Sequence, residues 1–202
     1  MPEALKKLIN TISYLPWIGE KSATKLGFFL LNANKNYLEN FKNSIDTIQT
    51  KIGKCKNCGC LVDAGKEQCS ICENPKRKSH IICVVEEYLD MLTIEQSGQF
   101  DWEYHILWGA ISPMNGVFIG DLSFELLFSR IEASEENVEL ILATNPNIEW
   151  EATNAYLKEE IAKRDIAYKT TITKLSRWLS SWYLEYADNI TIINALRDRK
   201  QI

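Results

Sequence analysis

Residues 79–87 read Ser-His-Ile-Ile-Cys-Val-Val-Glu-Glu, and this stretch decides the fold class. Its centre is a continuous apolar run rich in β-branched residues, and two carboxylates follow where the run ends. Strands that are apolar on both faces are typical of the buried interior of a parallel sheet. We therefore expect a central, buried, parallel strand here.

Further apolar runs alternate with helical patterns after this strand. We expect strands near residues 104–107, 138–144 and 167–173, helices near 88–97, 125–133 and 151–163, and a short strand or the start of a helix at 189–193. Alternating strands and helices indicate an α/β domain with a mainly parallel sheet.

The residues before this strand have a helical periodicity instead. Apolar side chains recur at helical spacing over residues 2–14, 21–31 and about 37–52. Leu15 and Pro16 interrupt the first pattern, and Trp17-Ile18-Gly19 reads as a tight turn. We expect a helical hairpin followed by a third helix.

Length and composition allow a sizeable core. The 202 residues are 46% hydrophobic, which suits one large domain or two or three small ones. No apolar run approaches the roughly 20 residues of a membrane helix, and the start is amphipathic, without the apolar core of a signal peptide. We expect a soluble, cytoplasmic protein with no membrane partner.

The charge is divided unevenly along the chain. Residues 1–80 carry 13 Lys and Arg against 7 Asp and Glu, whereas residues 81–202 carry 10 against 20. A basic end joined to an acidic body suggests a polyanion partner for the first part and protein partners for the second. The alternative is chance variation in a solvated surface.

Four cysteines have the spacing of a zinc site. Two CxxC pairs, Cys55 with Cys58 and Cys69 with Cys72, are separated by ten residues. Four thiolates satisfy tetrahedral zinc and leave no open coordination position, so the predicted metal is structural. A disulfide pair conflicts with a reducing compartment, and a redox motif needs only one pair. Cys60 and Cys83 fall outside this spacing, and we interpret them as ordinary buried or half-buried thiols.

The segment LPWIGEKSATKLGFFLL, residues 15–31, resembles a helix-hairpin-helix DNA-binding element, whose family form begins Leu-Pro-Gly-Ile-Gly. Such hairpins direct backbone N–H groups at a helix N-terminus toward phosphate, without reading bases. The resemblance implies sequence-independent DNA binding, with Lys21 and Lys25 as the candidate phosphate contacts. A plain helical corner with solvated lysines is the alternative.

The remaining motifs resemble the Toprim domain of the bacterial RecR family of recombination mediators. They are Ile82-Cys-Val-Val-Glu-Glu87, Leu142-Ala-Thr-Asn-Pro-Asn147, Glu149-Trp-Glu-Ala-Thr153 and the C-terminal Leu184-Glu-Tyr-Ala-Asp188. The order of the motifs is similar to RecR along the whole chain. It predicts a multi-domain α/β protein with a hairpin domain at 1–53, a zinc module at 54–78, a Toprim-like domain at 79–174 and a C-terminal segment at 175–202.

Catalytic Toprim enzymes hold a divalent metal with a strand-end Glu and an Asp-x-Asp pair. Glu86 matches the Glu, but Asn145 and Asn147 stand in the places of the aspartates. Neutral amides are poor Mg²⁺ anchors, so we do not expect Mg²⁺-dependent chemistry. For Glu86, Glu149 and Glu151 the resemblance implies protein docking or weak metal binding. For Glu149 and Glu151, exposed carboxylates that start a helix are the alternative.

The RecR resemblance implies a non-enzymatic mediator that works with RecO and RecF to load RecA onto single-stranded DNA. It also implies a homodimer or a homotetramer ring. Two rival functions stay open: a Mg²⁺-dependent Toprim nuclease or primase-like enzyme, and a zinc-bearing interaction module without DNA affinity.

The tryptophans depart from the family pattern. Trp17, Trp102, Trp108, Trp150, Trp178 and Trp182 all stand where RecR-like sequences place glycine. Glycine allows a positive φ and close backbone approach, which a bulky side chain opposes. We hypothesise that the source reads UGA as glycine and that these codons were translated as tryptophan.

Overall fold

The computed structural model describes residues 1–144, 147–176 and 187–202. The chain forms two compact units, Met1–Lys51 and Ile52–Ile202. The predicted division into four parts stays a prediction. Among the described residues, no helix combines the length and the apolar character needed to cross a membrane.

The first unit is helical, as predicted. It contains α1 (Glu3–Ser13), α2 (Glu20–Asn32) and α3 (Lys35–Lys51). Helices α1 and α2 pack through a small core of Ile9, Ile12 and Ala23. Helix α3 has no buried residue, so its apolar side chains are exposed in the single chain.

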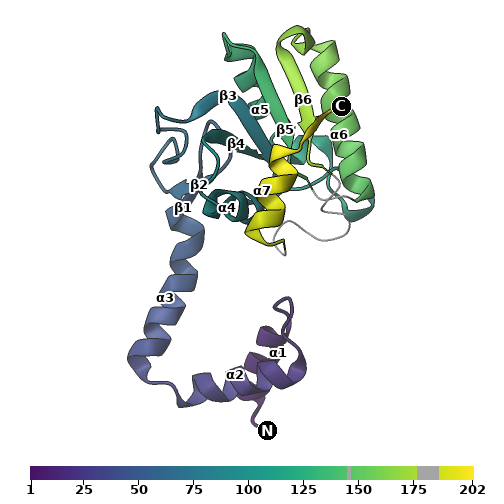
Figure 1. Ribbon diagram of the computed structural model, residues 1–202. Coiled ribbons are helices and arrows are strands. Elements are labelled where there is room, and N and C mark those ends of the chain that lie inside the picture. The colour runs from purple at the N-terminus through teal and green to yellow at the C-terminus, as the bar shows by residue number, and fades with distance from the viewer. Residues whose placement is uncertain (145–146, 177–186) are drawn as a thin grey trace. The chain divides into compact units, whose positions relative to one another are not determined.

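The second unit holds a five-stranded sheet of order β4-β3-β5-β6-β7 (Figure 1). Its strands are β3 (Lys78–Val85), β4 (Trp102–Ile106), β5 (Val138–Leu142), β6 (Thr170–Lys174) and β7 (Lys200–Gln201). The first four pair in parallel and only β6 with β7 is antiparallel, which confirms the predicted mainly parallel sheet.

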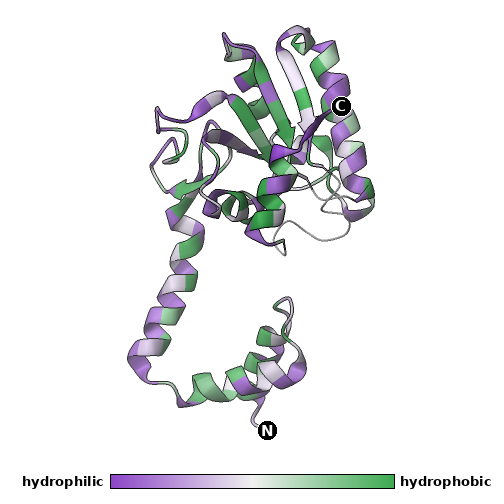
Figure 2. Ribbon diagram, in the orientation of Figure 1, coloured by the Kyte–Doolittle hydropathy of each residue, from purple (hydrophilic) through white to green (hydrophobic). Residues whose placement is uncertain are grey.

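Helices cover both faces of this sheet. Ile82 and Val84 of β3 face a core shared with α5 (Phe124–Ala133) and α6 (Ile148–Lys163). Cys83 and Val85 face the opposite core, which includes α4 (Tyr88–Gln96) and α7 (Asn189–Arg197). Burial on both faces explains why the β3 sequence is continuously apolar. Figure 2 shows the hydrophobic colouring concentrated on the central strands.

Several predicted boundaries need correction. Helix α6 begins at Ile148, before the predicted start at residue 151, because the Asn147 side chain accepts a hydrogen bond from the Trp150 N–H (2.9 Å) and caps the helix. Residues 167–169 form a 3-10 turn before β6. Residues 189–197 are a helix, which selects one of the two predicted alternatives.

Three short strands have no counterpart in the sequence prediction. Strands β1 (Ile52–Lys54) and β2 (Leu61–Asp63) pair antiparallel around the first CxxC pair, and β7 extends the main sheet. Ile52 therefore begins β1 and does not end the third helix. Strands of two or three residues carry too little periodicity to be recognised in a sequence.

Candidate metal centre and nucleic-acid interface

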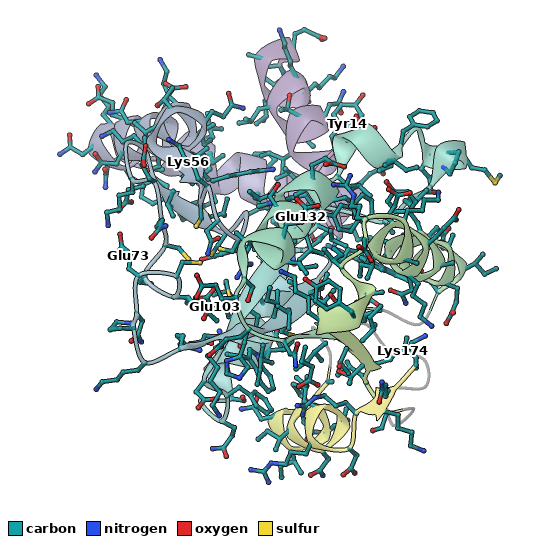
Figure 3. All side chains as sticks on the ribbon, turned by 90° about the horizontal axis from the view of Figure 1, so that it is seen from above. Tyr14, Lys56, Glu73, Glu103, Glu132 and Lys174 are labelled. Carbon is teal, nitrogen blue, oxygen red and sulfur yellow. The ribbon has the colours of Figure 1, made fainter. Side chains whose placement is uncertain are left out.

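The four spaced cysteines converge on one point of the second unit. The Sγ atoms of Cys55, Cys58, Cys69 and Cys72 all lie within 4.8 Å of one another, and the Cys58 and Cys69 sulfurs are 3.5 Å apart. All six cysteines are free thiols. Figure 3 shows sulfur atoms near the labelled Lys56 and Glu73.

The local fold explains this convergence. The β1–β2 hairpin carries the first pair, and Gly59 turns the chain with φ +73°. The N–H of Cys55 donates to the Cys60 carbonyl (2.7 Å), and the N–H of Lys56 donates to the Glu67 carbonyl (2.8 Å), which brings the two halves of the module together.

The donor set fits a tetrahedral soft metal. Zinc–sulfur bonds of about 2.3 Å place thiolates about 3.8 Å apart, which agrees with the spacing of these sulfurs. The amide of Asn57 donates to the Cys72 sulfur (3.3 Å), an outer hydrogen bond of the kind that orients a metal ligand. Hydrogen bonds from the thiols of Cys58, Cys60 and Cys72 lower the pKa of Cys69. A bound cation would displace the protons of the ligand thiols.

The turn of the helical hairpin presents an uncapped helix N-terminus. Gly19 is the N-cap of α2, and no side chain caps this end. The N–H groups of Ser22 and Ala23 bond to the Gly19 carbonyl, whereas those of Glu20 and Lys21 have no acceptor within the fully described residues 1–51. Free N–H groups and the helix dipole together favour an anion.

The two predicted lysines lie beside this end of the helix. Lys21 and Lys25 are exposed and are one turn apart on α2. The ion pairs found among the described residues all lie in the second unit, from Lys56 to Arg199. Both lysines therefore keep their charge available for an external partner.

The predicted acidic residues have separate local partners. The indole N–H of Trp150 donates to the Glu86 carboxylate, and Glu151 pairs with Lys174 at 2.6 Å. In the part of the chain that the structure describes, the four cysteines are the one group of three or more His, Cys, Asp or Glu close enough to hold a metal. Glu86, Glu149 and Glu151 are thus not gathered into such a group.

Asn145 and Asn147 stand in the places of the two aspartates of catalytic Toprim enzymes. Asn147 caps α6, which gives it a structural role, and Asn145 lies outside the described residues. Lys174 and Asp90 were not predicted as site residues. Asp90 is buried and accepts a hydrogen bond from the N–H of Glu87 (3.0 Å) at the start of α4. An acidic residue three positions after a helix N-cap is the signal that could have found Asp90.

Two of the six tryptophans have the backbone conformation that favours glycine. Trp17 has φ +67° and is 94% exposed, and Trp108 has φ +68°. Trp102 and Trp150 have no positive φ and are buried, so their backbone conformation does not favour glycine. Trp178 and Trp182 lie outside the described residues.

The comparisons with known proteins cover the whole chain. The Toprim domain matches residues 80–173. A protein of Herpetosiphon aurantiacus named "Recombination protein RecR" is 40% identical over 100% of this chain and 96% of its own length. Proteins of the same name from Dehalococcoides mccartyi and Desulforapulum autotrophicum are 38% and 36% identical, each over 98% of this chain and over 94% and 97% of their own lengths.

Proposed function

The chain belongs to the RecR family of recombination proteins, and we propose that it is a DNA-binding recombination mediator without enzymatic activity. In this proposal it acts in the cytoplasm with RecO and RecF type proteins to promote RecA loading onto single-stranded DNA. The observation that carries the proposal is the uncapped N-terminus of α2, with Lys21 and Lys25 beside it, which form no ion pair with any residue that the structure describes.

Binding of this kind is independent of base sequence. The free N–H groups and the two ammonium groups can reach phosphate oxygens, and phosphate contacts position a protein on DNA without reading its bases. The basic charge of residues 1–80 supports the same assignment.

The test is fluorescence anisotropy of gapped DNA across a salt series. Loss of two phosphate contacts in Lys21→Ala/Lys25→Ala should flatten the slope of log affinity against log salt by about 1.4 to 1.8. Lys35→Ala/Lys42→Ala on α3 removes the same charge away from the α2 N-terminus and should keep most of the slope.

Other outcomes distinguish the rival functions. If wild-type binding is absent or independent of salt, the chain is an interaction module without DNA affinity. Mg²⁺-dependent DNA cleavage or primer synthesis that Glu86→Ala abolishes would support the nuclease or primase-like alternative.

We propose that the four cysteines hold structural Zn²⁺. Four thiolates complete the coordination of zinc, so the metal would stabilise the module around residues 54–78 and leave no position for a substrate. Metal analysis of the purified protein should find one zinc per chain, and Mg²⁺ should not replace it.

We propose a homodimer or a homotetramer ring assembled in part through α3. Phe29 and Tyr37 contact edge to face (5.7 Å between ring centroids), Tyr37 and Phe41 are stacked (6.3 Å), and Ile45 and Ile48 continue the stripe along α3. The five side chains are between 44% and 56% exposed, and such a continuous apolar stripe is typical of an interface.

Light scattering after gel filtration tests the assembly. Phe41→Glu/Ile45→Glu should shift the protein to a smaller species. Asn43→Glu/Thr50→Glu adds the same charge to the polar side of α3 and should leave the mass unchanged. Equal masses for the two variants would contradict an interface on this stripe.

We propose that the acidic Toprim surface at Glu86, Glu149 and Glu151 meets a RecO or RecF type partner, with weak metal binding as the alternative. The net charge of residues 81–202 supports contact with a basic protein surface. Glu149→Gln/Glu151→Gln should slow association with that partner at low salt, and Glu135→Gln/Glu136→Gln, also within the acidic part, is the matched control.

A further inference from the structure

The loop that connects β4 to α5, residues 111–122, closes on itself through its own hydrogen bonds. We call it the β4–α5 loop. Ser112 and Val117 exchange both backbone N–H to carbonyl bonds (3.0 Å each) across its neck. The Asn115 amide donates to the Ser112 hydroxyl (2.8 Å), and Gly116 turns the chain at the tip with φ +75°. The polar groups of the tip are therefore satisfied within the loop.

Both ends of the β4–α5 loop are fixed to the rest of the second unit. The N–H of Ile111 donates to the Thr153 hydroxyl of α6 (2.9 Å). At the other end Leu122 is buried in the core shared with α5 and α6, and the N–H of Ser123 donates to the Leu107 carbonyl (3.2 Å). A loop that is already ordered loses little conformational entropy when it binds.

Three large apolar side chains of this loop are left in solvent. Met114 is 99% exposed, Phe118 58% and Ile119 44%. A single exposed apolar residue is ordinary, but several on one ordered loop are typical of a recognition surface. The folded chain does not bury these side chains, so their apolar surface is available to a partner.

The chain around the loop is acidic. Residues 79–129 contain eight Asp and Glu and no Lys or Arg. Four of the eight form ion pairs with Lys or Arg from other segments, namely Glu95, Asp101, Glu103 and Glu125. Asp121 of the loop is exposed and forms no ion pair with any residue that the structure describes. The loop therefore offers an uncompensated carboxylate beside its apolar side chains.

A chain of hydrogen bonds joins the loop to the proposed partner surface. The Thr153 hydroxyl, which accepts from Ile111, donates to the Glu149 carbonyl in the first turn of α6 (2.7 Å). Glu149 has no ion pair among the described residues either. The base of the β4–α5 loop and the proposed contact residue Glu149 thus belong to one continuous surface.

We propose that the β4–α5 loop inserts into an apolar pocket of a basic partner protein, with Met114 and Phe118 as its anchors. The inference rests on the proposed partner surface at Glu149 and supplies its apolar part. Buried apolar anchors within a charged rim are the usual anatomy of a protein interface. Carboxylates without neighbouring cations repel DNA phosphates and anionic lipids, so the chemistry favours a protein with Lys or Arg around the pocket.

Biolayer interferometry of the full-length protein with purified RecO type and RecF type proteins tests the proposal. Met114→Ser/Phe118→Ser should weaken binding on the order of tenfold or more, mainly through faster dissociation, because buried anchors govern dissociation. Tyr168→Ser/Ile190→Ser removes two other apolar side chains of the second unit, 79% and 71% exposed, and should bind like the wild type.

A photo-reactive benzophenone side chain at position 114 locates the pocket. It should crosslink to a partner segment that combines apolar residues with Lys or Arg, whereas the same group at position 168 should not. Met114 is almost fully exposed, so Met114→Ser alone should keep the wild-type melting temperature and still weaken binding. This variant separates loss of the contact from loss of folding.

The outcomes distinguish this inference from the proposed function. Equal affinities of the wild type and the Met114→Ser/Phe118→Ser variant would overturn the docking role of the loop. Wild-type binding to neither protein would instead refute the proposed partnership, and the inference with it. A smaller mass of the loop variant in light scattering would make a second copy of this chain the occupant, and weaker DNA binding would make it a nucleic acid. Either result would overturn the choice of a partner protein.

Discussion

Gly27 of α2 lies so close to Ile9 of α1 that a Cβ atom at position 27 would stand 2.7 Å from Ile9 Cγ1. The two helices of the hairpin meet at this point, since both residues are buried. The close approach fixes how α2, with its uncapped N-terminus, is held on α1.

Gly27→Ala should therefore destabilise the hairpin by about 1–3 kcal/mol, because one side chain or one helix must move. Urea unfolding monitored by circular dichroism measures the change. In an Ile9→Ala background the same substitution should cost much less, and an equal cost in both backgrounds would contradict the contact.

Trp17→Gly should stabilise the first unit by about 1–2 kcal/mol, because a non-glycine residue with φ +67° is strained and the exposed indole offers little packing in return. Trp17→Ala keeps the Cβ atom and should bring little of this gain. The codons provide an independent check: UGG at the six tryptophan positions would exclude the recoding hypothesis.

His105 should make stability depend on pH. Burial, followed by the charge of Arg130, lowers the pKa of His105 to about 3, whereas the unfolded chain has an ordinary histidine. The unfolded state therefore binds one more proton at intermediate pH, and stability is lost as the pH falls below about 6.5, by up to about 1.4 kcal/mol per pH unit. His105→Gln should flatten the curve of stability against pH between pH 6.5 and 4.5.

Glu103 and Arg130 form an ion pair whose side chains are only 9% and 8% exposed. Glu103→Gln should destabilise the second unit by about 3–5 kcal/mol, because it leaves a buried guanidinium without its counter-charge. The double variant Glu103→Leu/Arg130→Met should recover most of that loss. Glu67→Gln, in the exposed pair with Lys56, should change the unfolding midpoint little.

Metal removal should destabilise more than the cysteine module. Cys55, Cys58, Cys60 and Cys69 belong to the same core as Met91 and Ile94 of α4. A chelator should thus lower the melting temperature of the second unit, and added zinc should restore it. In a variant with serine at the four cysteine positions, neither the chelator nor added zinc should change the melting temperature. A wild-type melting temperature that the chelator leaves unchanged would contradict the structural role.

The sequence predicted the main elements because their patterns are long and their burial is regular. The apolar run of β3 is buried on both faces, and the amphipathic pattern of α1 places Ile9 and Ile12 in the hairpin core. The CxxC spacing identified the four cysteines that converge. Strands β1, β2 and β7 were missed, since pairing across the chain defines strands this short.

The amino-acid sequence alone was enough to predict the fold class, the helical hairpin and the four cysteines that converge, because each follows from periodicity or spacing within a short stretch of chain. The three-dimensional structure was needed to show that Asn147 caps α6 and that Glu86 and Glu151 have separate partners. These relationships depend on atoms brought together from distant segments or on side-chain direction, and neither is encoded in local periodicity.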